Sequence, residues 1–278
     1  MRGGGRVAAT ERAGVARGLA VPAAGGVRSG AMHGLAGLAV CLLLAAPAMA
    51  ADGSGRRMLG AEEAAPFRGV GRVNIAGTRF CTGTLIAPDE VLTAAHCLYH
   101  PRTGARVPPE EIRFVAGLNV GTKAALRRVV QAVPDPGFSF GAAGPEGVQA
   151  DLALLVLEAP IPAAAALPLA PGGLGGEPAA IVSYRRDRPQ APSIAAPCAV
   201  IAGFGSGIAL DCAVTEGVSG APVVQGEGPA RRIVAVVSAM GRTVGGPPRD
   251  VALAARVEPA LAALRALVAP RGAQGQDP

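Results

Sequence analysis

Three residues of this sequence could together carry out nucleophilic acyl transfer: His96, Asp151 and Ser219. A serine hydroxyl becomes a strong nucleophile only when an imidazole removes its proton, and a carboxylate must hold that imidazole in the right tautomer. His96 ends the run Leu92-Thr93-Ala94-Ala95-His96, Asp151 opens the apolar run Leu152–Leu157, and Ser219 lies in Gly-Val-Ser-Gly-Ala-Pro. Alone, each would be an ordinary packed histidine, strand-end aspartate or turn serine. Together, the three contexts predict a Ser-His-Asp triad.

The glycine two residues before Ser219 predicts a second part of such a site. Gly217 lets the backbone turn so that the N–H groups of Gly217 and Ser219 point inward. Donors of this kind stabilise the negative charge that develops on a substrate carbonyl oxygen, each by about 3–4 kcal/mol of barrier. We therefore expect Gly217 and Ser219 to form an oxyanion hole.

The elements that must position these residues read as short strands separated by Gly- and Pro-rich loops, which indicates an all-β barrel or sandwich. The expected strands are Val70–Ile75, Arg79–Ile86, Ile112–Ala116, Arg128–Val133, Asp151–Leu157, Ile181–Tyr184, Ala199–Gly203, Ala221–Gln225 and Ile233–Ala239. Val91-Leu92-Thr93, just before His96, is also strand-like. One helix of about three turns is expected from Glu258 to Val268, because Leu recurs at every third position and Glu-Pro suits a helix start.

The first 50 residues are expected to be a leader with a signal peptide that is cut off after Ala50. Leu35–Ala46 forms an apolar stretch, and Ala48-Met49-Ala50 fits the small-x-small cleavage rule. The stretch is shorter than the roughly 20 apolar residues that a membrane helix needs, so no membrane association is expected after cleavage. The sequence leaves open whether Met1 or Met32 is the true start.

A second cut is suggested by Arg56-Arg57 just before Met58, which would make residues 51–57 a propeptide. The alternative is a solvated charge pair in a flexible lead segment. A folded domain is then expected over residues 58–268, followed by a disordered tail at 269–278.

Charge and cysteine content narrow the choice of partners and compartment. The leader holds five of the 26 basic residues and one of the 20 acidic ones, so the remaining chain is nearly neutral and nucleic-acid binding is not expected. Four cysteines remain after the leader, an even number that suggests two disulfides in an exported protein. They are Cys81, Cys97, Cys198 and Cys212, and the residues alone leave all three pairings open. No metal site is expected, because only His96 and His100 remain and Cys-x-x-Cys is absent.

Four segments resemble the trypsin/chymotrypsin-like serine peptidases, in which the triad also runs His, Asp, Ser. These segments are Cys81–Ile86, Val91–Cys97, Asp151–Leu155 and Asp211–Pro222. Within that family, Met58-Leu59-Gly60-Ala61 resembles the mature start of the bacterial glutamyl-endopeptidase-like branch.

The resemblance implies two packed six-stranded antiparallel β-barrels with a short C-terminal helix and the site in the cleft between the barrels. His96 and Asp151 would come from the first barrel and Ser219 from the second. It also implies a Cys81–Cys97 disulfide beside His96, which leaves Cys198 and Cys212 as the second pair.

Two departures from the family pattern bear on activation and specificity. Val218 replaces the acidic residue that receives the freed α-amino group in trypsin-type activation, so that switch is absent. The pocket for the residue before the cut should be lined by Ala213–Glu216 and Val237–Met240. Ala213 then stands where trypsin has its pocket aspartate, while Val214 and Val237 replace the Thr and His of Glu-specific enzymes. With Ser238 as a further lining residue, the sequence predicts a preference for small or apolar residues.

The expected function is that of a secreted or periplasmic serine endopeptidase that acts on proteins or peptides without a cofactor. The alternative is an inactive, peptidase-like binding protein. An esterase is disfavoured because Ala221 stands where the nucleophile elbow Gly-x-Ser-x-Gly needs its last glycine. The sequence does not predict the oligomeric state.

Overall fold

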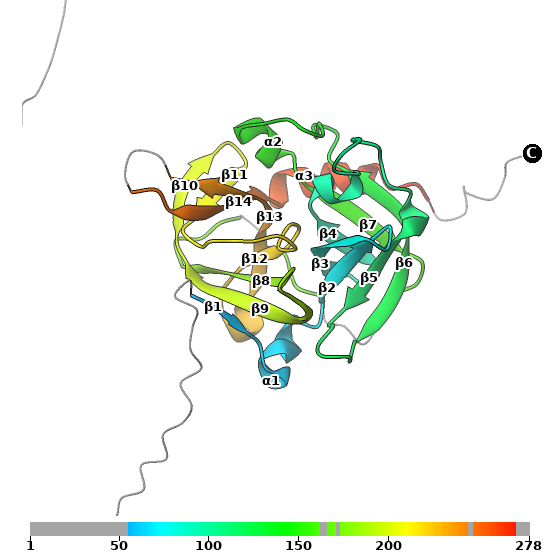
Figure 1. Cartoon of the computed structure of the whole chain (residues 1–278), viewed down its shortest axis with the longest axis horizontal. Helices are drawn as coiled ribbons and strands as arrows, with labels where there is room; N and C mark the ends of the chain where they lie inside the picture. Colours follow the sequence, from blue (N-terminus) through cyan, green and yellow to red (C-terminus); the bar gives the residue numbers. More distant parts are fainter. Residues whose placement is uncertain (1–54, 162–165, 171–172, 244–246, 271–278) are drawn as a thin grey trace, which may run out of the picture. The chain divides into compact units, whose positions relative to one another are not determined.

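The computed structural model describes residues 55–161, 166–170, 173–243 and 247–270, all within one compact unit that spans Met49–Pro278. The fold is all-β with a short C-terminal helix, as the sequence predicted (Figure 1). The predicted leader, most of the predicted propeptide and residues 271–278 of the predicted tail lie outside the described residues. None of the helices among the described residues is long and apolar enough to cross a membrane.

The first sheet is a closed six-stranded barrel with the strand order β2-β3-β4-β7-β6-β5. Its strands are β2 (Val70–Ile75), β3 (Arg79–Ala87), β4 (Glu90–Thr93), β5 (Ile112–Ala116), β6 (Ala125–Pro134) and β7 (Ala153–Leu157). Its interior is filled mainly by aliphatic side chains around Phe114. Gly71 is required where β2 passes that ring, because a Cβ at this position would lie 2.5 Å from the Phe114 side chain.

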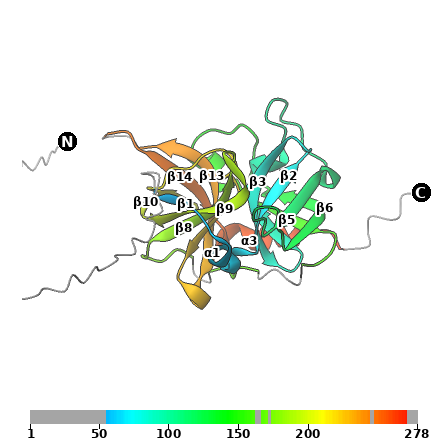
Figure 2. The ribbon, with the colours of Figure 1, turned by 60° about the horizontal axis from the view of Figure 1, so that its bottom comes forward.

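The second sheet is open and curled, with the strand order β1-β9-β8-β12-β13-β14-β11-β10 (Figures 1 and 2). Its strands are β1 (Arg56–Met58), β8 (Ala179–Arg185), β9 (Arg188–Cys198), β10 (Val200–Phe204), β11 (Gly207–Leu210), β12 (Pro222–Gln225), β13 (Arg232–Arg242) and β14 (Asp250–Arg256). The resemblance implied six strands here. The additional two are β1, which pairs with the outer edge of β9, and β10, which forms a hairpin with β11.

Helices are few and short. The helices are α1 (Ala61–Ala64), α2 (Pro145–Gln149) and α3 (Glu258–Ala266), with the 3₁₀ helices η1 (Ala65–Phe67), η2 (Ala95–Leu98), η3 (Pro109–Glu111) and η4 (Gly228–Ala230). Helix α3 confirms the predicted terminal helix, and it buries Leu261 and Leu264. The chain continues in contact with the first barrel, since the Ala269 N–H donates to Gln131 Oε1 at 2.9 Å.

All nine predicted strands are present within a few residues, but four strands were missed. Strand β9 holds Pro189, Pro192 and Pro197, which argue against a strand in the sequence. Proline lacks the N–H that a paired strand needs on both sides. All three prolines lie outside Ser193–Ala195, the stretch of β9 that pairs with a strand on both sides. Strands β1, β11 and β14 were missed because β1 and β11 are very short and β14 is rich in alanine.

The suggested processing site lies inside strand β1 rather than in a flexible lead segment. Arg56 and Arg57 pair with Ala195 and Ile194 of β9. Leu59, immediately afterwards, is buried at 2% exposure, and its N–H donates to the Pro192 carbonyl at 3.0 Å. The pairing of β1 with β9 would therefore have to open before a protease could cut after Arg57.

Both disulfides have the expected partners: Cys81 is bonded to Cys97, and Cys198 to Cys212. The first ties β3 to η2. The second ties the end of β9 to the segment after β11, so it joins two strands that lie near opposite edges of the curled sheet. With separations of 16 and 14 residues, each should add about 3 kcal/mol to the free energy of unfolding.

Candidate active site

His96 is held at the rim of the first barrel by the element before it and the disulfide after it. Strand β4 ends at the fully buried Thr93, and the chain then turns into η2, which carries His96. Cys97, the next residue, is bonded to Cys81 of β3. The His96 side chain keeps 32% of its surface exposed, so the ring remains accessible from the cavity beside it.

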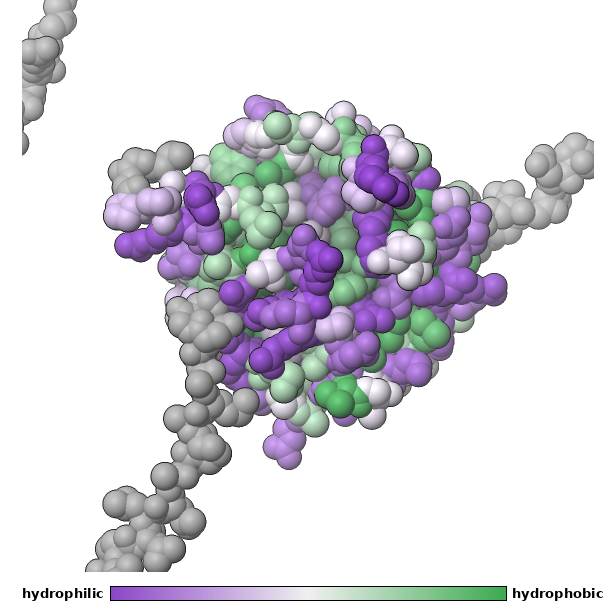
Figure 3. Space-filling view, in the orientation of Figure 1, coloured by the Kyte–Doolittle hydropathy of each residue, from purple (hydrophilic) through white to green (hydrophobic). Residues whose placement is uncertain are grey.

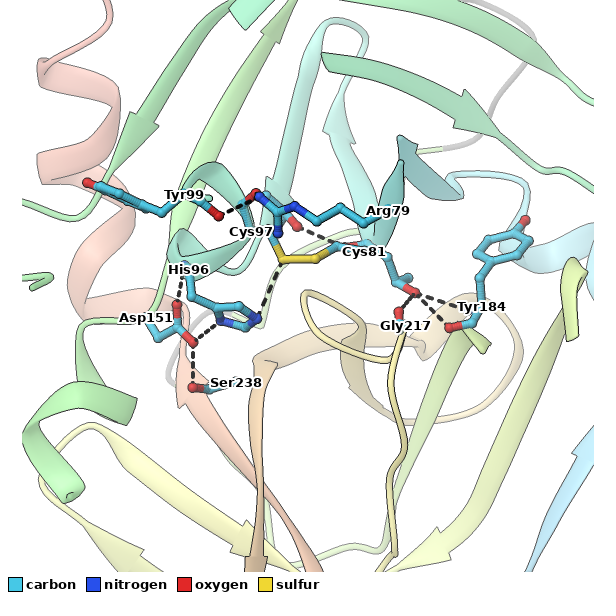
Figure 4. The surroundings of a disulfide bond; sticks show 11 residues. Arg79, Cys81, His96, Cys97, Tyr99, Asp151, Tyr184, Gly217 and Ser238 are labelled. Atoms are coloured by element: carbon cyan, nitrogen blue, oxygen red, sulfur yellow. Dashed lines mark hydrogen bonds and ion pairs between the residues drawn. A yellow bond between two sulfur atoms is a disulfide. The ribbon is translucent and has the colours of Figure 1, made fainter. Parts of the chain in front are cut away.

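Asp151 lies between α2 and β7, and its side chain is only 4% exposed. Both of its oxygens bind His96: Oδ1 accepts from the backbone N–H at 2.8 Å, and Oδ2 lies 2.7 Å from ring Nδ1 (Figure 4). Because an ionised carboxylate only accepts hydrogen bonds, the Nδ1 position carries the proton in the neutral ring. Nε2, the other ring nitrogen, is thereby left as a base.

Ser238 also binds this carboxylate, a contact that the sequence did not predict. Its hydroxyl donates to Asp151 Oδ2 at 2.5 Å (Figure 4). Ser238 lies in a β-bulge of β13, where the pairing with β14 shifts between Val237 and Ala239. A bulge changes the direction of a side chain, which here turns the hydroxyl toward Asp151. The sequence placed Ser238 in the wall of a specificity pocket, and no sequence signal marks a bulge at this residue.

The contacts among His96, Asp151 and Ser238 are consistent with the hydrogen-bond network of a catalytic triad. Ser238 binds the carboxylate, however, whereas a nucleophilic serine must reach the basic Nε2 on the other side of the ring. The Ser238 hydroxyl therefore supports the negative charge of Asp151.

Ser219 lies in the turn before β12, and its backbone is tied to both sheets. Its carbonyl accepts from the Thr82 N–H of β3 at 2.8 Å. The Gly220 N–H donates to the Val237 carbonyl at 2.8 Å. The turn packs so tightly on the first barrel that a Cβ on Gly220 would lie 2.1 Å from the Thr82 carbonyl oxygen and 2.3 Å from Thr93 Oγ1. Gly220 also has φ +81°, so glycine is needed here on both counts.

These contacts bring Ser219 beside residues that lie close in the chain to Cys81, His96 and Ser238. Thr82 follows Cys81, Thr93 lies three residues before His96, and Val237 precedes Ser238. Residues far apart in the chain are thus held together by backbone contacts between the two sheets.

The two predicted oxyanion donors belong to peptide groups whose carbonyls are already bound. The Glu216 carbonyl accepts from the Arg186 N–H at 2.9 Å, and the Val218 carbonyl accepts from the Ala221 N–H at 2.9 Å. In a trans peptide the N–H points opposite to the carbonyl, so the N–H groups of Gly217 and Ser219 point away from these partners. Within the described part of the chain, neither N–H donates to a backbone carbonyl.

A cavity of 880 Å³ adjoins His96, Asp151 and Ser238. Its other walls are largely apolar and come from the loop and helix before Asp151 and from the second sheet. They include Phe138, Phe140, Val148, Phe204, Met240 and Leu253. Apolar side chains are visible on this face below α2 (Figure 3). Arg242 lies at the cavity wall and is paired with Asp250 at 3.2 Å.

The positions predicted to set specificity are mostly buried in the second sheet. Val214 and Val237 are 7% and 1% exposed, and both belong to its apolar core. Ala213 is half-buried. Ala213, Val214, Val237 and Ser238 carry no charge, whereas Glu216, at the end of the first predicted range, is paired with Arg186.

Cys81, His96 and Cys97 place a nitrogen and two sulfur atoms within 4.8 Å of one another. Both sulfurs are joined in the disulfide, whereas zinc binding by cysteine requires the thiolate. This cluster therefore does not supply a metal site.

An all-β fold with a His–Asp pair beside a cavity, and with a glycine-flanked serine in a turn held against both sheets, defines a trypsin-like serine peptidase. The trypsin-like peptidase domain family matches residues 81–236, more than half of the chain, so the chain belongs to this family. The fold is similar to that of a Glu endopeptidase solved in complex with MPD, with a TM-score of 0.61 and 20% identity over 77% of this chain and 94% of that one.

Two curated relatives match shorter stretches. A trypsin from Saccharopolyspora erythraea is 36% identical over 101 residues, which are 34% of this chain and 38% of the relative. Coagulation factor XII from Cavia porcellus is 54% identical over 41 residues, which are 15% of this chain and 6% of the relative. This chain thus spans well under half the length of either curated relative.

Proposed function

We propose that this protein is an active endopeptidase in which Ser219 is the nucleophile, His96 the general base and Asp151 the residue that orients His96. The observation that carries the proposal is the pair of hydrogen bonds that His96 donates to Asp151, through its backbone N–H and ring Nδ1, which leaves Nε2 as the base. The backbone contacts that hold Ser219 beside the same group of residues support its assignment as nucleophile.

The reaction follows from these roles. His96 Nε2 takes the hydroxyl proton as Ser219 Oγ attacks the substrate carbonyl carbon, and the carbonyl oxygen becomes an oxyanion. The N–H groups of Gly217 and Ser219 donate to that oxyanion. When the C–N bond breaks, His96 returns the proton to the leaving amine, and an acyl-enzyme forms on Ser219. Water, activated by His96 in the same way, then releases the acid product.

A fluorophosphonate probe tests this proposal and its alternative, an inactive binding protein. We expect the folded protein to be labelled once, and peptide mapping should find the adduct on Ser219 rather than on Ser238. The two serines are separable because Arg231 and Arg232 allow tryptic cleavage between them. Folded, processed protein that is not labelled would favour the binding protein, and an adduct on Ser238 would refute the assignment of the nucleophile.

We propose a preference for small or apolar residues before the cut. The burial of Val214 and Val237 supports a shallow pocket without a charge, and the large cavity beside His96 supports apolar contacts further along the substrate. In a peptide library, cleavage should be concentrated after Ala, Val and Leu, because none of Ala213, Val214, Val237 and Ser238 carries a charge that could compensate a buried ionic side chain. Cleavage mainly after Glu, Lys or Arg would contradict this preference.

The two disulfides are consistent with an extracellular protein, since such bonds persist in oxidising compartments. We propose that the protein is secreted or periplasmic and that its substrates are proteins or peptides.

A further inference from the structure

We propose that Thr82, in the first barrel, is a positioning residue for the oxyanion loop, which we define as Thr215–Ser219. Its hydroxyl holds this loop of the second sheet in the active conformation. The inference rests on the proposed function of Gly217 and Ser219. Thr82 lies in β3 of the first barrel and is fully buried, whereas the oxyanion loop belongs to the second half of the unit.

The Thr82 hydroxyl can donate one hydrogen bond, and the distances to nearby oxygen atoms indicate its acceptor. Oγ1 accepts from the Tyr184 N–H at 3.0 Å. It lies 2.9 Å from the Gly217 carbonyl oxygen and 3.4 Å from that of Tyr184. The shorter distance assigns the proton to Gly217, so Thr82 bridges β8 and the oxyanion loop (Figure 4 shows the two partners).

This bond fixes the peptide group next to the predicted oxyanion donor. The Gly217–Val218 peptide is held at both ends, since its carbonyl accepts from Thr82 and its N–H donates to the Thr215 carbonyl at 3.2 Å. The preceding peptide is held through its carbonyl by the Arg186 N–H. With both planes fixed, the direction of the Gly217 N–H is fixed as well.

Gly217 needs such a restraint because glycine is the residue most free to change conformation. Its φ is +91°, and a Cβ here would lie 2.7 Å from the Phe80 ring and 3.0 Å from the Tyr184 carbonyl oxygen. No other residue fits, so the backbone conformation has to be maintained by the partners of the loop.

Tyr184, the partner of Thr82 in β8, is held by burial and by a hydrogen bond of its own. Tyr184 is fully buried in the apolar cluster shared by the two sheets, and its hydroxyl donates to the Leu118 carbonyl at 2.9 Å. Burial raises the pKa of the Tyr184 phenol, so that donor keeps its proton across the physiological pH range.

The role assigned to Thr82 accounts for how the loop is ordered without an acidic residue before the nucleophile. Val218 is 2% exposed and packs in the apolar core of the second sheet. Because its side chain has no charge, it cannot form an ion pair with a freed α-amino group. The bonds from Thr82 to the loop involve no chain terminus. The structure therefore assigns the ordering of the oxyanion loop to this inter-sheet hydroxyl.

Thr82→Val tests the inference, and Thr84→Val is a matched control. Thr84 lies two residues further along β3, is 1% exposed, and its hydroxyl has no hydrogen-bond partner among the described residues. Thr82→Val leaves the Gly217 carbonyl and the Tyr184 N–H without their partner, which favours rotation of the Gly217 peptide. We expect kcat to fall about ten- to a hundredfold with KM within about twofold of wild type, since the loss of a whole oxyanion donor costs about 10²–10³.

Three further readouts separate positioning from general destabilisation. A peptide boronate should bind Thr82→Val more weakly by the same factor as kcat falls, Thr82→Ser should restore both values, and Thr84→Val should change neither. Hydrogen exchange of the peptide that contains Thr215–Ser219 should speed up in Thr82→Val and stay as in wild type in Thr84→Val. Thr82→Ala replaces Thr82→Val if the latter does not fold.

A wild-type kcat in folded Thr82→Val, an equal loss in Thr84→Val, or a failure of Thr82→Ser to restore activity would each overturn the inference. Fluorophosphonate labelling of wild type reports separately on the proposed function. If that labelling fails, the exchange measurement still decides whether Thr82 orders the loop.

Discussion

Replacement of Ser219 by alanine is expected to lower kcat by about a million-fold, because it removes the atom that attacks the substrate. The backbone contacts of Ser219 with Thr82 do not involve its side chain, so the turn should keep its shape. KM and the thermal unfolding midpoint should therefore stay close to those of wild type. Steady-state hydrolysis of a peptide amide substrate, with calorimetry on the same preparations, would measure all three quantities.

Ser238→Ala is the matched control for this experiment. Ser238 is the serine whose hydroxyl contacts Asp151, and its loss removes one of three hydrogen bonds to that carboxylate. We expect a fall in kcat of roughly tenfold, many orders of magnitude smaller than for Ser219→Ala. If Ser238→Ala were as inactive as Ser219→Ala, the roles assigned to the two serines would have to be revised.

Replacement of Asp151 by asparagine should lower kcat by about 10⁴-fold, as expected when the orienting carboxylate of a Ser-His-Asp triad is lost. The Asp151 carboxylate accepts from three donors: the His96 N–H, ring Nδ1–H and the Ser238 hydroxyl. An asparagine has only one oxygen. Its NH₂ group would therefore face a donor of the site in either orientation of the amide. This clash is best removed if the NH₂ group faces ring Nδ1 and the ring proton moves to Nε2. His96 then cannot accept the proton of Ser219.

The same substitution should change KM little, because only 4% of the Asp151 side chain is exposed. Glu158→Gln is a suitable control, since it converts an exposed carboxylate paired with Arg128 into an amide. It should leave kcat unchanged. A loss of less than tenfold in Asp151→Asn would show that Asp151 does not set the tautomer of His96.

The sequence by itself determined the parts of this protein that depend on local pattern. Gly/Pro clusters around short strand-like runs predicted Val70–Ile75 and Ile112–Ala116 with their observed ends, because such clusters mark the turns between strands. The motifs around His96 and Asp151 predicted a pair that the structure joins by two hydrogen bonds. Family resemblance predicted both disulfide pairs.

Only the tertiary structure decided the features that arise where distant segments meet. The contact of Ser238 with Asp151 depends on a bulge in β13, and the role assigned to Thr82 depends on a carbonyl that lies 135 residues away in the chain. Strand β1 exists because β9 offers it an edge, although three residues carry almost no periodic signal of their own. Hydrogen bonds between distant segments leave no pattern in the sequence of either segment. Local sequence patterns therefore predict the residue types of a site but not the contacts that hold those residues in place.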